Sequence, residues 1–127
     1  MKKVIIIIIS MLLLCACGNK ENEEKKEVAN VKKITCADVN ALVSEGAIII
    51  DVRTSDEYNE DHIEGAINID SSQIKYAIKG KVTDFETKVI VYCRSGNRSA
   101  ESAKILTELG YKNVYDMGAL SGCYGEE

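Results

Sequence analysis

Residues 88–99 of the chain read Lys88-Val89-Ile90-Val91-Tyr92-Cys93-Arg94-Ser95-Gly96-Asn97-Arg98-Ser99. The first half is a short, β-branched, apolar run, which is typical of a strand buried on both faces of a sheet. The second half is polar and leads into a helix that we expect from Ser99 to Leu109. In open α/β sheets, ligands bind beyond the carboxyl ends of the strands. The pattern therefore predicts an α/β fold with a functional loop that starts at Cys93.

Short apolar runs alternate with amphipathic segments on both sides of this loop. We expect further strands at residues 47–52, 66–69 and 113–116. We expect further helices around residues 39–43, ended by Gly46, from residue 55 onward, and around residues 74–78, ended by Gly80. Alternation of this kind predicts a parallel sheet with helices on both faces.

Cys93 lies in a polar and cationic sequence environment. Residues 95–97 can take turn conformations whose N–H groups point inward, beside the positive end of the following helix. Arg94 and Arg98 add positive charge. These surroundings favour the nucleophilic thiolate, whereas an inert buried cysteine would have apolar neighbours. We therefore predict that Cys93 is catalytic. The residues predicted to bind the substrate are Arg94, Ser95, Gly96, Asn97 and Arg98.

Motifs along the whole domain resemble those of a single rhodanese domain. In chain order they are Asp51-Val52-Arg53, Glu57-Tyr58, His62-Ile63-Glu64-Gly65-Ala66-Ile67-Asn68-Ile69 and the segment 89–99. The resemblance covers about residues 31–125 and implies a small parallel five-stranded sheet with helices on both faces. It also implies that Cys93 takes a sulfane sulfur from a small anionic donor such as thiosulfate. Cys93 would hold that sulfur as a persulfide among the N–H groups of residues 94–98 and pass it to a thiol or cyanide-like acceptor. We expect no metal and no cofactor.

The chain departs from the family pattern at three places outside this loop. Asp61 and Glu64 stand where a Gly and a Pro are frequent. The family's closing Gly-Gly-x-x-x-Trp appears as Gly118-Ala119-Leu120-Ser121-Gly122-Cys123. The missing Trp removes a large packing group, so we expect a looser C-terminal end.

Three residues outside the loop are predicted to support the site rather than react. Asp51 and Arg53 follow a strand and should brace the active-site loops by ion pairing, with Glu57 as a further candidate partner of Arg53. His62 is the single histidine. The family's matching histidine is usually structural, and a preformed thiolate needs no base.

The N-terminus resembles a bacterial lipoprotein signal. Two lysines precede an apolar run at residues 4–14, which is shorter than the ~20 residues of a membrane-spanning helix. Leu14-Cys15-Ala16-Cys17 resembles a lipobox, with Cys17 as the lipidated residue; an ordinary signal peptide with chance cysteines is the alternative. We expect a signal peptide at residues 1–16, a lipidated Cys17 with a charged flexible tether at residues 17–30, and the rhodanese-like domain at residues 31–127. The lipid would anchor the protein on the extracytoplasmic side of the cell membrane.

Composition and cysteine count limit the partners. The formal net charge of −4 does not suggest a nucleic-acid partner, and we expect a monomer. Cys36, Cys93 and Cys123 remain after processing, and this odd count leaves at least one free thiol, which fits a free Cys93. A disulfide between Cys93 and Cys123 would make a redox device, a hypothesis that rests on the count alone.

Other functions fit parts of the pattern. A phosphatase or an arsenate reductase is the first alternative. Tyrosine-specific and dual-specific cysteine phosphatases have five residues between the Cys and the Arg, whereas four separate Cys93 from Arg98. The smaller ring has less room for a tetrahedral phosphate and suits a single sulfur. A non-catalytic persulfide carrier, a binding module and a redox sensor acting through Cys93 are the remaining alternatives.

Overall fold

Five parallel strands form the centre of the molecule. The computed structural model describes residues 31–123, so the predicted signal peptide, Cys17 and the tether lie outside the described residues. The strands are β1 (Val31–Lys33), β2 (Ile48–Asp51), β3 (Ile67–Asn68), β4 (Lys88–Cys93) and β5 (Asn113–Ala119). They are ordered β1-β5-β4-β2-β3, and every neighbouring pair is parallel. The predicted α/β fold with a five-stranded parallel sheet is confirmed.

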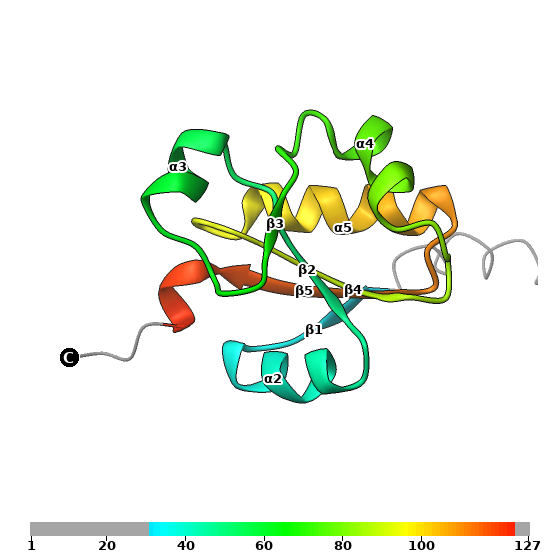
Figure 1. Ribbon diagram of the computed structural model, residues 1–127, viewed down its shortest axis with the longest axis horizontal. Coiled ribbons are helices and arrows are strands. Elements are labelled where there is room, and N and C mark those ends of the chain that lie inside the picture. The colour runs from blue at the N-terminus through cyan, green and yellow to red at the C-terminus, as the bar shows by residue number, and fades with distance from the viewer. Residues whose placement is uncertain (1–30, 124–127) are drawn as a thin grey trace, which may run out of the picture.

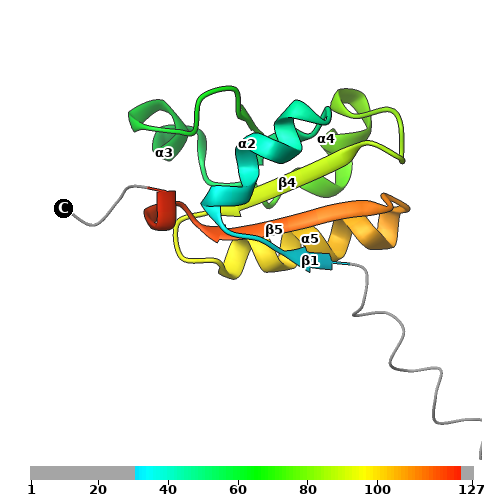
Figure 2. The ribbon, with the colours of Figure 1, turned by 90° about the horizontal axis from the view of Figure 1, so that it is seen from below.

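Helices cover both faces of this sheet, as predicted. The helices are α2 (Cys36–Ser44), α3 (Ser55–Glu60), α4 (Ile74–Lys81) and α5 (Asn97–Leu109), followed by the 3-10 helix η3 (Leu120–Cys123). Figure 1 shows α4 and α5 above the sheet and α2 below it, and Figure 2 shows α2 from its own side. The helix α3 and η3 lie near the carboxyl ends of the central strands (Figure 1).

Alternation along β4 divides the core in two. Val89, Val91 and Cys93 pack on the face covered by α4 and α5. Ile90 and Tyr92 pack on the face covered by α2. All five side chains are buried, as the apolar run predicts for a central strand.

Several boundaries differ from those predicted. The strand β1 has no counterpart in the pattern, because it is a three-residue edge strand with two exposed lysines. The helix α4 passes through Gly80 to Lys81, and α5 begins at Asn97 rather than Ser99. Gly80 costs a helix only about 1 kcal/mol relative to Ala, so it need not end one. The strand β5 extends three residues beyond the predicted end.

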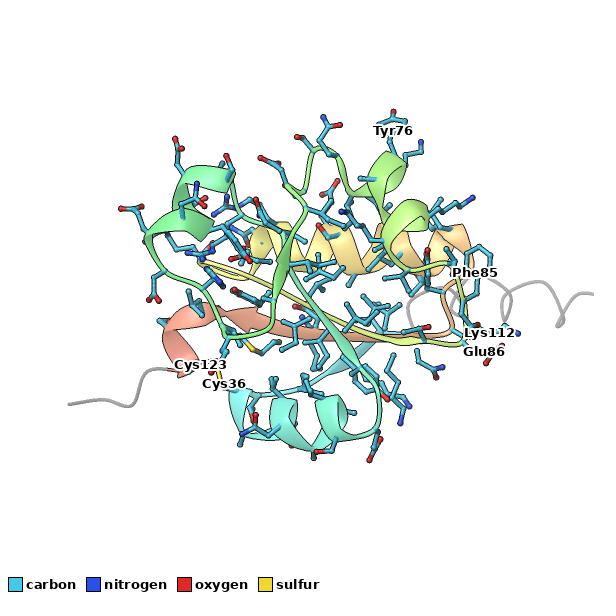
Figure 3. All side chains as sticks on the ribbon, viewed as in Figure 1. Cys36, Tyr76, Phe85, Glu86, Lys112 and Cys123 are labelled. Atoms are coloured by element: carbon cyan, nitrogen blue, oxygen red, sulfur yellow. A yellow bond between two sulfur atoms is a disulfide. The ribbon has the colours of Figure 1, made fainter. Side chains whose placement is uncertain are left out.

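A disulfide joins Cys36, the first residue of α2, to Cys123, the last residue of η3 (Figure 3). Cys93 is free. The hypothesis of a Cys93–Cys123 disulfide is therefore wrong, because Cys36 and Cys123 pack on one face of the sheet while Cys93 packs on the other. The disulfide joins η3 to α2 and Leu120 is buried, while the expectation of a looser C-terminal end stays a prediction.

No helix within residues 31–123 combines the length and the apolar character that crossing a bilayer requires.

Candidate active site

Two backbone N–H groups converge on the sulfur of Cys93. The Sγ atom accepts hydrogen bonds from the N–H of Gly96 at 2.9 Å and from the N–H of Ser99 at 3.3 Å. Ser99 lies in the first turn of α5, so the positive end of that helix also faces the sulfur. Donors in this arrangement stabilise negative charge on Sγ.

Gly96 makes this geometry possible. It has φ +102°, in the left-handed region that side chains other than glycine rarely adopt. Its carbonyl oxygen accepts a hydrogen bond from Ser99 Oγ at 3.1 Å, which closes the turn. The chain can therefore reverse over the sulfur and enter α5 within a few residues, leaving Cys93 fully buried beneath the loop.

Ser99 contacts the sulfur but was not among the predicted site residues. The predicted substrate-binding set, residues 94–98, ended at Arg98, and the helix was expected to begin at Ser99, whereas α5 begins at Asn97. Ser95 and Asn97 are exposed on the loop. Of the predicted set, Gly96 has a donor on the sulfur, and the role of the others stays a prediction.

One carboxylate binds both arginines of the loop. Glu57 accepts from Arg94 Nε at 3.0 Å and from two nitrogens of Arg98 at 2.8 and 3.2 Å. The hydrogen bond from Arg98 is the main reason that the pKa of Glu57 lies well below its usual range, and Thr54 and Arg94 add to the effect. The same pairing raises the pKa of Arg98.

Glu57 is placed for this task by the start of α3. Thr54 caps that helix, its hydroxyl accepting from the Glu57 N–H while the Glu57 carboxylate accepts from the Thr54 N–H. The expectation that Glu57 partners Arg53 is corrected: Arg53 pairs with Asp51, and Glu57 is occupied by Arg94 and Arg98.

A buried polar network supports the loops beside the site. Arg53 Nε and Nη2 donate to the carboxylate of Asp51 at 3.0 and 2.7 Å, and Tyr92 OH donates to the same carboxylate at 2.8 Å. Arg53 Nη2 also donates to the carbonyl of Asp61 at 2.5 Å, and the N–H of Ile63 donates to Tyr92 OH at 3.1 Å. The network links the ends of β2 and β4 to the loop after α3. The hydrogen bond to Asp51 raises the pKa of Arg53, and burial raises the pKa of Tyr92.

His62 lies two residues beyond the C-terminal end of α3. Its Nδ1 is 2.8 Å from the carbonyl oxygen of Tyr58, and the two rings stack with centroids 3.7 Å apart. Among the described residues, the His62 ring makes these contacts with Tyr58 and no hydrogen bond with Cys93. This position fits the predicted supporting role better than that of a base.

A pocket of about 280 Å³ opens beside the loop at the carboxyl edge of the sheet. It is lined by Arg53, Glu57, Glu60, Asp61, Arg94, Leu120 and Ser121. Cys93 does not line it, but Arg94 follows Cys93 directly, and Leu120 follows Ala119, the partner of Cys93 across β4 and β5. Within residues 31–123, no cluster of three or more His, Cys, Asp or Glu side chains is placed to hold a metal ion.

Comparisons with known proteins identify the family. The family model of the rhodanese-like domain matches residues 35–120. Thiosulfate sulfurtransferase PspE of Escherichia coli (strain K12) is 41% identical over 71 residues, which are 56% of this chain and 68% of that protein. Thiosulfate sulfurtransferase GlpE of Pseudomonas entomophila (strain L48) is 31% identical over 90 residues, which are 71% of this chain and 81% of that protein.

Solved structures agree with the sequence comparisons. A rhodanese with anions from E. coli superimposes with a TM-score of 0.59 at 36% identity, covering 63% of this chain and 94% of that one. The human single-domain sulfurtransferase TSTD1 has a TM-score of 0.63 at 22% identity, covering 78% and 98%, and shows the shared fold. The chain therefore belongs to the rhodanese-like family of sulfurtransferases.

Proposed function

We propose that the protein is a membrane-anchored sulfurtransferase in which Cys93 carries the transferred sulfur as a persulfide. The donor is a small sulfane-sulfur anion such as thiosulfate, and the acceptor is a thiol or a cyanide-like nucleophile. The observation that carries the proposal is the convergence of the Gly96 and Ser99 N–H groups on Cys93 Sγ.

Two displacements on sulfur account for the reaction. The Cys93 thiolate attacks the outer sulfur of thiosulfate, a new S–S bond forms, and the old S–S bond breaks with its electron pair leaving on sulfite. The acceptor, reacting as an anion, then attacks the terminal sulfur of the persulfide, and the electron pair returns to Cys93. Negative charge on Sγ at the start and the end of the cycle is stabilised by the two N–H groups and the start of α5.

The state of Arg98 supports sulfur transfer over phosphate chemistry. A phosphatase uses the forked guanidinium of its loop arginine to hold phosphate oxygens. Here two nitrogens of Arg98 are already bound to Glu57. This pairing and the four-residue spacing from Cys93 both favour a single bound sulfur.

Lipid anchoring through Cys17 on the extracytoplasmic side is part of the proposal. The lipobox-like segment motivates it, and the Cys36–Cys123 disulfide supports it, since disulfides persist in oxidising compartments. Growth of the producing cells with a labelled fatty acid should label the wild type and not Cys17→Ser. Equal labelling of the two proteins would contradict the anchor.

Mass spectrometry after incubation with thiosulfate tests the chemistry. We expect the peptide that contains Cys93 to gain the mass of one sulfur atom, with release of sulfite, and both signals to vanish in Cys93→Ser. Transfer to cyanide should then yield thiocyanate. A persulfide that forms but passes to no acceptor would identify a carrier, and a protein that takes no sulfur from several donors would contradict the proposal.

A further inference from the structure

Arg53 has unused hydrogen-bonding capacity that faces the pocket beside the loop. Its side chain is only 4% exposed, and Nε and Nη2 are bound to Asp51 and to the Asp61 carbonyl. Nη1 has no hydrogen-bond partner among the described residues. Among the described residues, Ser102 Oγ is the one side-chain nitrogen or oxygen that is both buried from solvent and without a hydrogen-bond partner. Since Nη1 of Arg53 also has no partner, it must be accessible to solvent. Arg53 lines the pocket, so the pocket is the open space that the structure describes beside this side chain.

Arg94 supplies a second cation to the same pocket. Its Nε is bound to Glu57, while its terminal nitrogens make no hydrogen bond with the described residues. Two guanidinium groups with free N–H donors form a recognition site for a carboxylate or a similar planar anion.

The pocket also presents unpaired negative charge. Glu60 lines it from the end of α3, one residue before the carbonyl that binds Arg53. The Glu60 carboxylate is exposed and makes no hydrogen bond or ion pair with the described residues. A dianion such as thiosulfate would be repelled by Glu60, whereas a ligand with an ammonium group as well as a carboxylate would satisfy both signs of charge.

We propose that this pocket is the acceptor site of the enzyme and that it binds thiols carrying both an α-carboxylate and an α-ammonium group, such as a cysteine-like amino acid. The proposal rests on the sulfurtransferase function proposed above. Arg53 and Arg94 hold the carboxylate, and Glu60 holds the ammonium group.

The position of the pocket suits attack on a persulfide. Cys93 itself is buried and does not line the pocket, but the terminal sulfur of a persulfide lies about 2 Å beyond Sγ. The acceptor thiolate attacks that sulfur, a new S–S bond forms on the acceptor, and the Cys93 thiolate leaves. The products are an amino-acid persulfide and free enzyme, and no further oxidant or reductant is needed.

Three small thiols, used as acceptors, test the carboxylate and the ammonium group of the ligand separately. L-Cysteine carries both groups, 3-mercaptopropionate only the carboxylate, and cysteamine only the ammonium group. The enzyme is first loaded with sulfur on Cys93, and the transfer rate to each thiol is then measured in single turnovers. Failure to load would contradict the proposed function, whereas loading without discrimination among the thiols would contradict the acceptor site alone.

Glu60 variants give the decisive comparison. Glu60→Gln should raise the half-saturating concentration of L-cysteine and of cysteamine about fivefold, since a charged contact of about 1 kcal/mol corresponds to that factor, and it should lower the half-saturating concentration of 3-mercaptopropionate, which the Glu60 carboxylate repels. Glu60→Lys should make 3-mercaptopropionate a better acceptor than in the wild type. Lysine is well tolerated at the end of a helix, so α3 should persist.

Glu64→Gln is the matched control. Glu64 is exposed, lies near the same loop and does not line the pocket, so this change should leave all three thiols unaffected. Intact mass after alkylation must show the Cys36–Cys123 disulfide still formed, because the thiols can reduce it and η3 carries Ser121 of the pocket wall. Equal effects of Glu60→Gln on all three thiols, or none, would overturn the acceptor site.

Discussion

Gly96 and Glu57 are the residues that hold the loop over Cys93. Gly96 allows the left-handed turn that points its own N–H at the sulfur. Glu57 forms ion pairs with both arginines of the loop, Arg94 and Arg98. Gly96 could be predicted, because a glycine between a strand and a helix indicates a tight turn. The partners of Glu57 could not, because a sequence does not say which arginines of a loop turn toward α3.

Replacing Gly96 by Ala should disturb the loop through backbone strain. A Cβ at Gly96 would find its nearest neighbour, the Gly118 Cα, at 3.9 Å, so there is room for the methyl group, and the cost lies in φ +102°. We expect a loss of about 1–2 kcal/mol in the free energy of unfolding and a fall in persulfide formation as the N–H leaves Sγ. Denaturant unfolding and the sulfur-loading assay measure the two effects.

Gly80→Ala is the control for that change. Gly80 lies inside α4 without a positive φ, and a methyl group there would have no neighbouring atom within 4 Å. Alanine at this position should stabilise the domain by about 0.5–1 kcal/mol and leave sulfur loading intact. Similar behaviour of the two variants would show that Gly96 has no special role.

Glu57 should make the domain sensitive to acid. Its pKa is lowered in the folded state, mainly by the hydrogen bond from Arg98, so its contribution to stability is complete above the unfolded value of about 4.3 and is lost as the pH falls further. We expect the wild type to lose stability between about pH 5 and 3 more steeply than Glu57→Gln. Denaturant unfolding across this range measures the difference, with Glu60→Gln as a control on the same helix. Parallel curves for the wild type and Glu57→Gln would contradict the ion-pair role.

At the scale of elements, the segment from β4 through the loop to α5 was predictable and the periphery was not. An apolar strand followed by a glycine-containing loop and an amphipathic helix has a distinct pattern, and Cys93 lies where that pattern changes. The predicted start of α5, Ser99, lies two residues after the observed start at Asn97, and the contact of the Ser99 N–H with the sulfur was not predicted. The short strand β1 has no alternation to reveal it, and the pocket combines residues from α3, the loop and η3 that only the tertiary fold brings together.

Tyr92 connects β4 to the loop after α3. Its hydroxyl donates to Asp51 and accepts from the N–H of Ile63, and Tyr92→Phe leaves that N–H without its partner. We expect a loss of about 1–2 kcal/mol in the free energy of unfolding. Tyr115→Phe is the control: Tyr115 is also buried, and its hydroxyl makes no hydrogen bond with the described residues, so its loss should be nearly neutral. Equal losses in the two variants would show that the Tyr92 network does not support the loop.

At the scale of the whole molecule, the disulfide closes the domain. Cys36 and Cys123 are separated by 87 positions, and almost all of the sheet lies between them. The number of cysteines alone did not show which two form the disulfide. Cys36 and Cys123 pair because they pack on the same face of the sheet, whereas Cys93 packs on the other face.

Removing this crosslink should cost much of the domain's stability. A loop of this length corresponds to roughly 3–5 kcal/mol in the chain-entropy account of disulfides. We expect Cys36→Ser/Cys123→Ser to lower the free energy of unfolding by this amount, and Cys93→Ser, which keeps the disulfide, to lower it far less. Denaturant unfolding under non-reducing conditions measures both, and similar losses in the two proteins would show that the disulfide adds no stability of its own.

The same disulfide determines which part of the domain bears a mechanical force that is applied to the two ends of the chain. The Cα atoms of Cys36 and Cys123 are 5.1 Å apart, so a pull applied to the two ends of the chain runs through the S–S bond and bypasses the segment between them. Within residues 31–123, β1 and its pairing with β5 are the part of the sheet that lies in the path of the load. Under tension the oxidised domain acts as a short inextensible link. Reduction would release a hidden length on the order of 300 Å, at about 3.5 Å for each residue pulled straight.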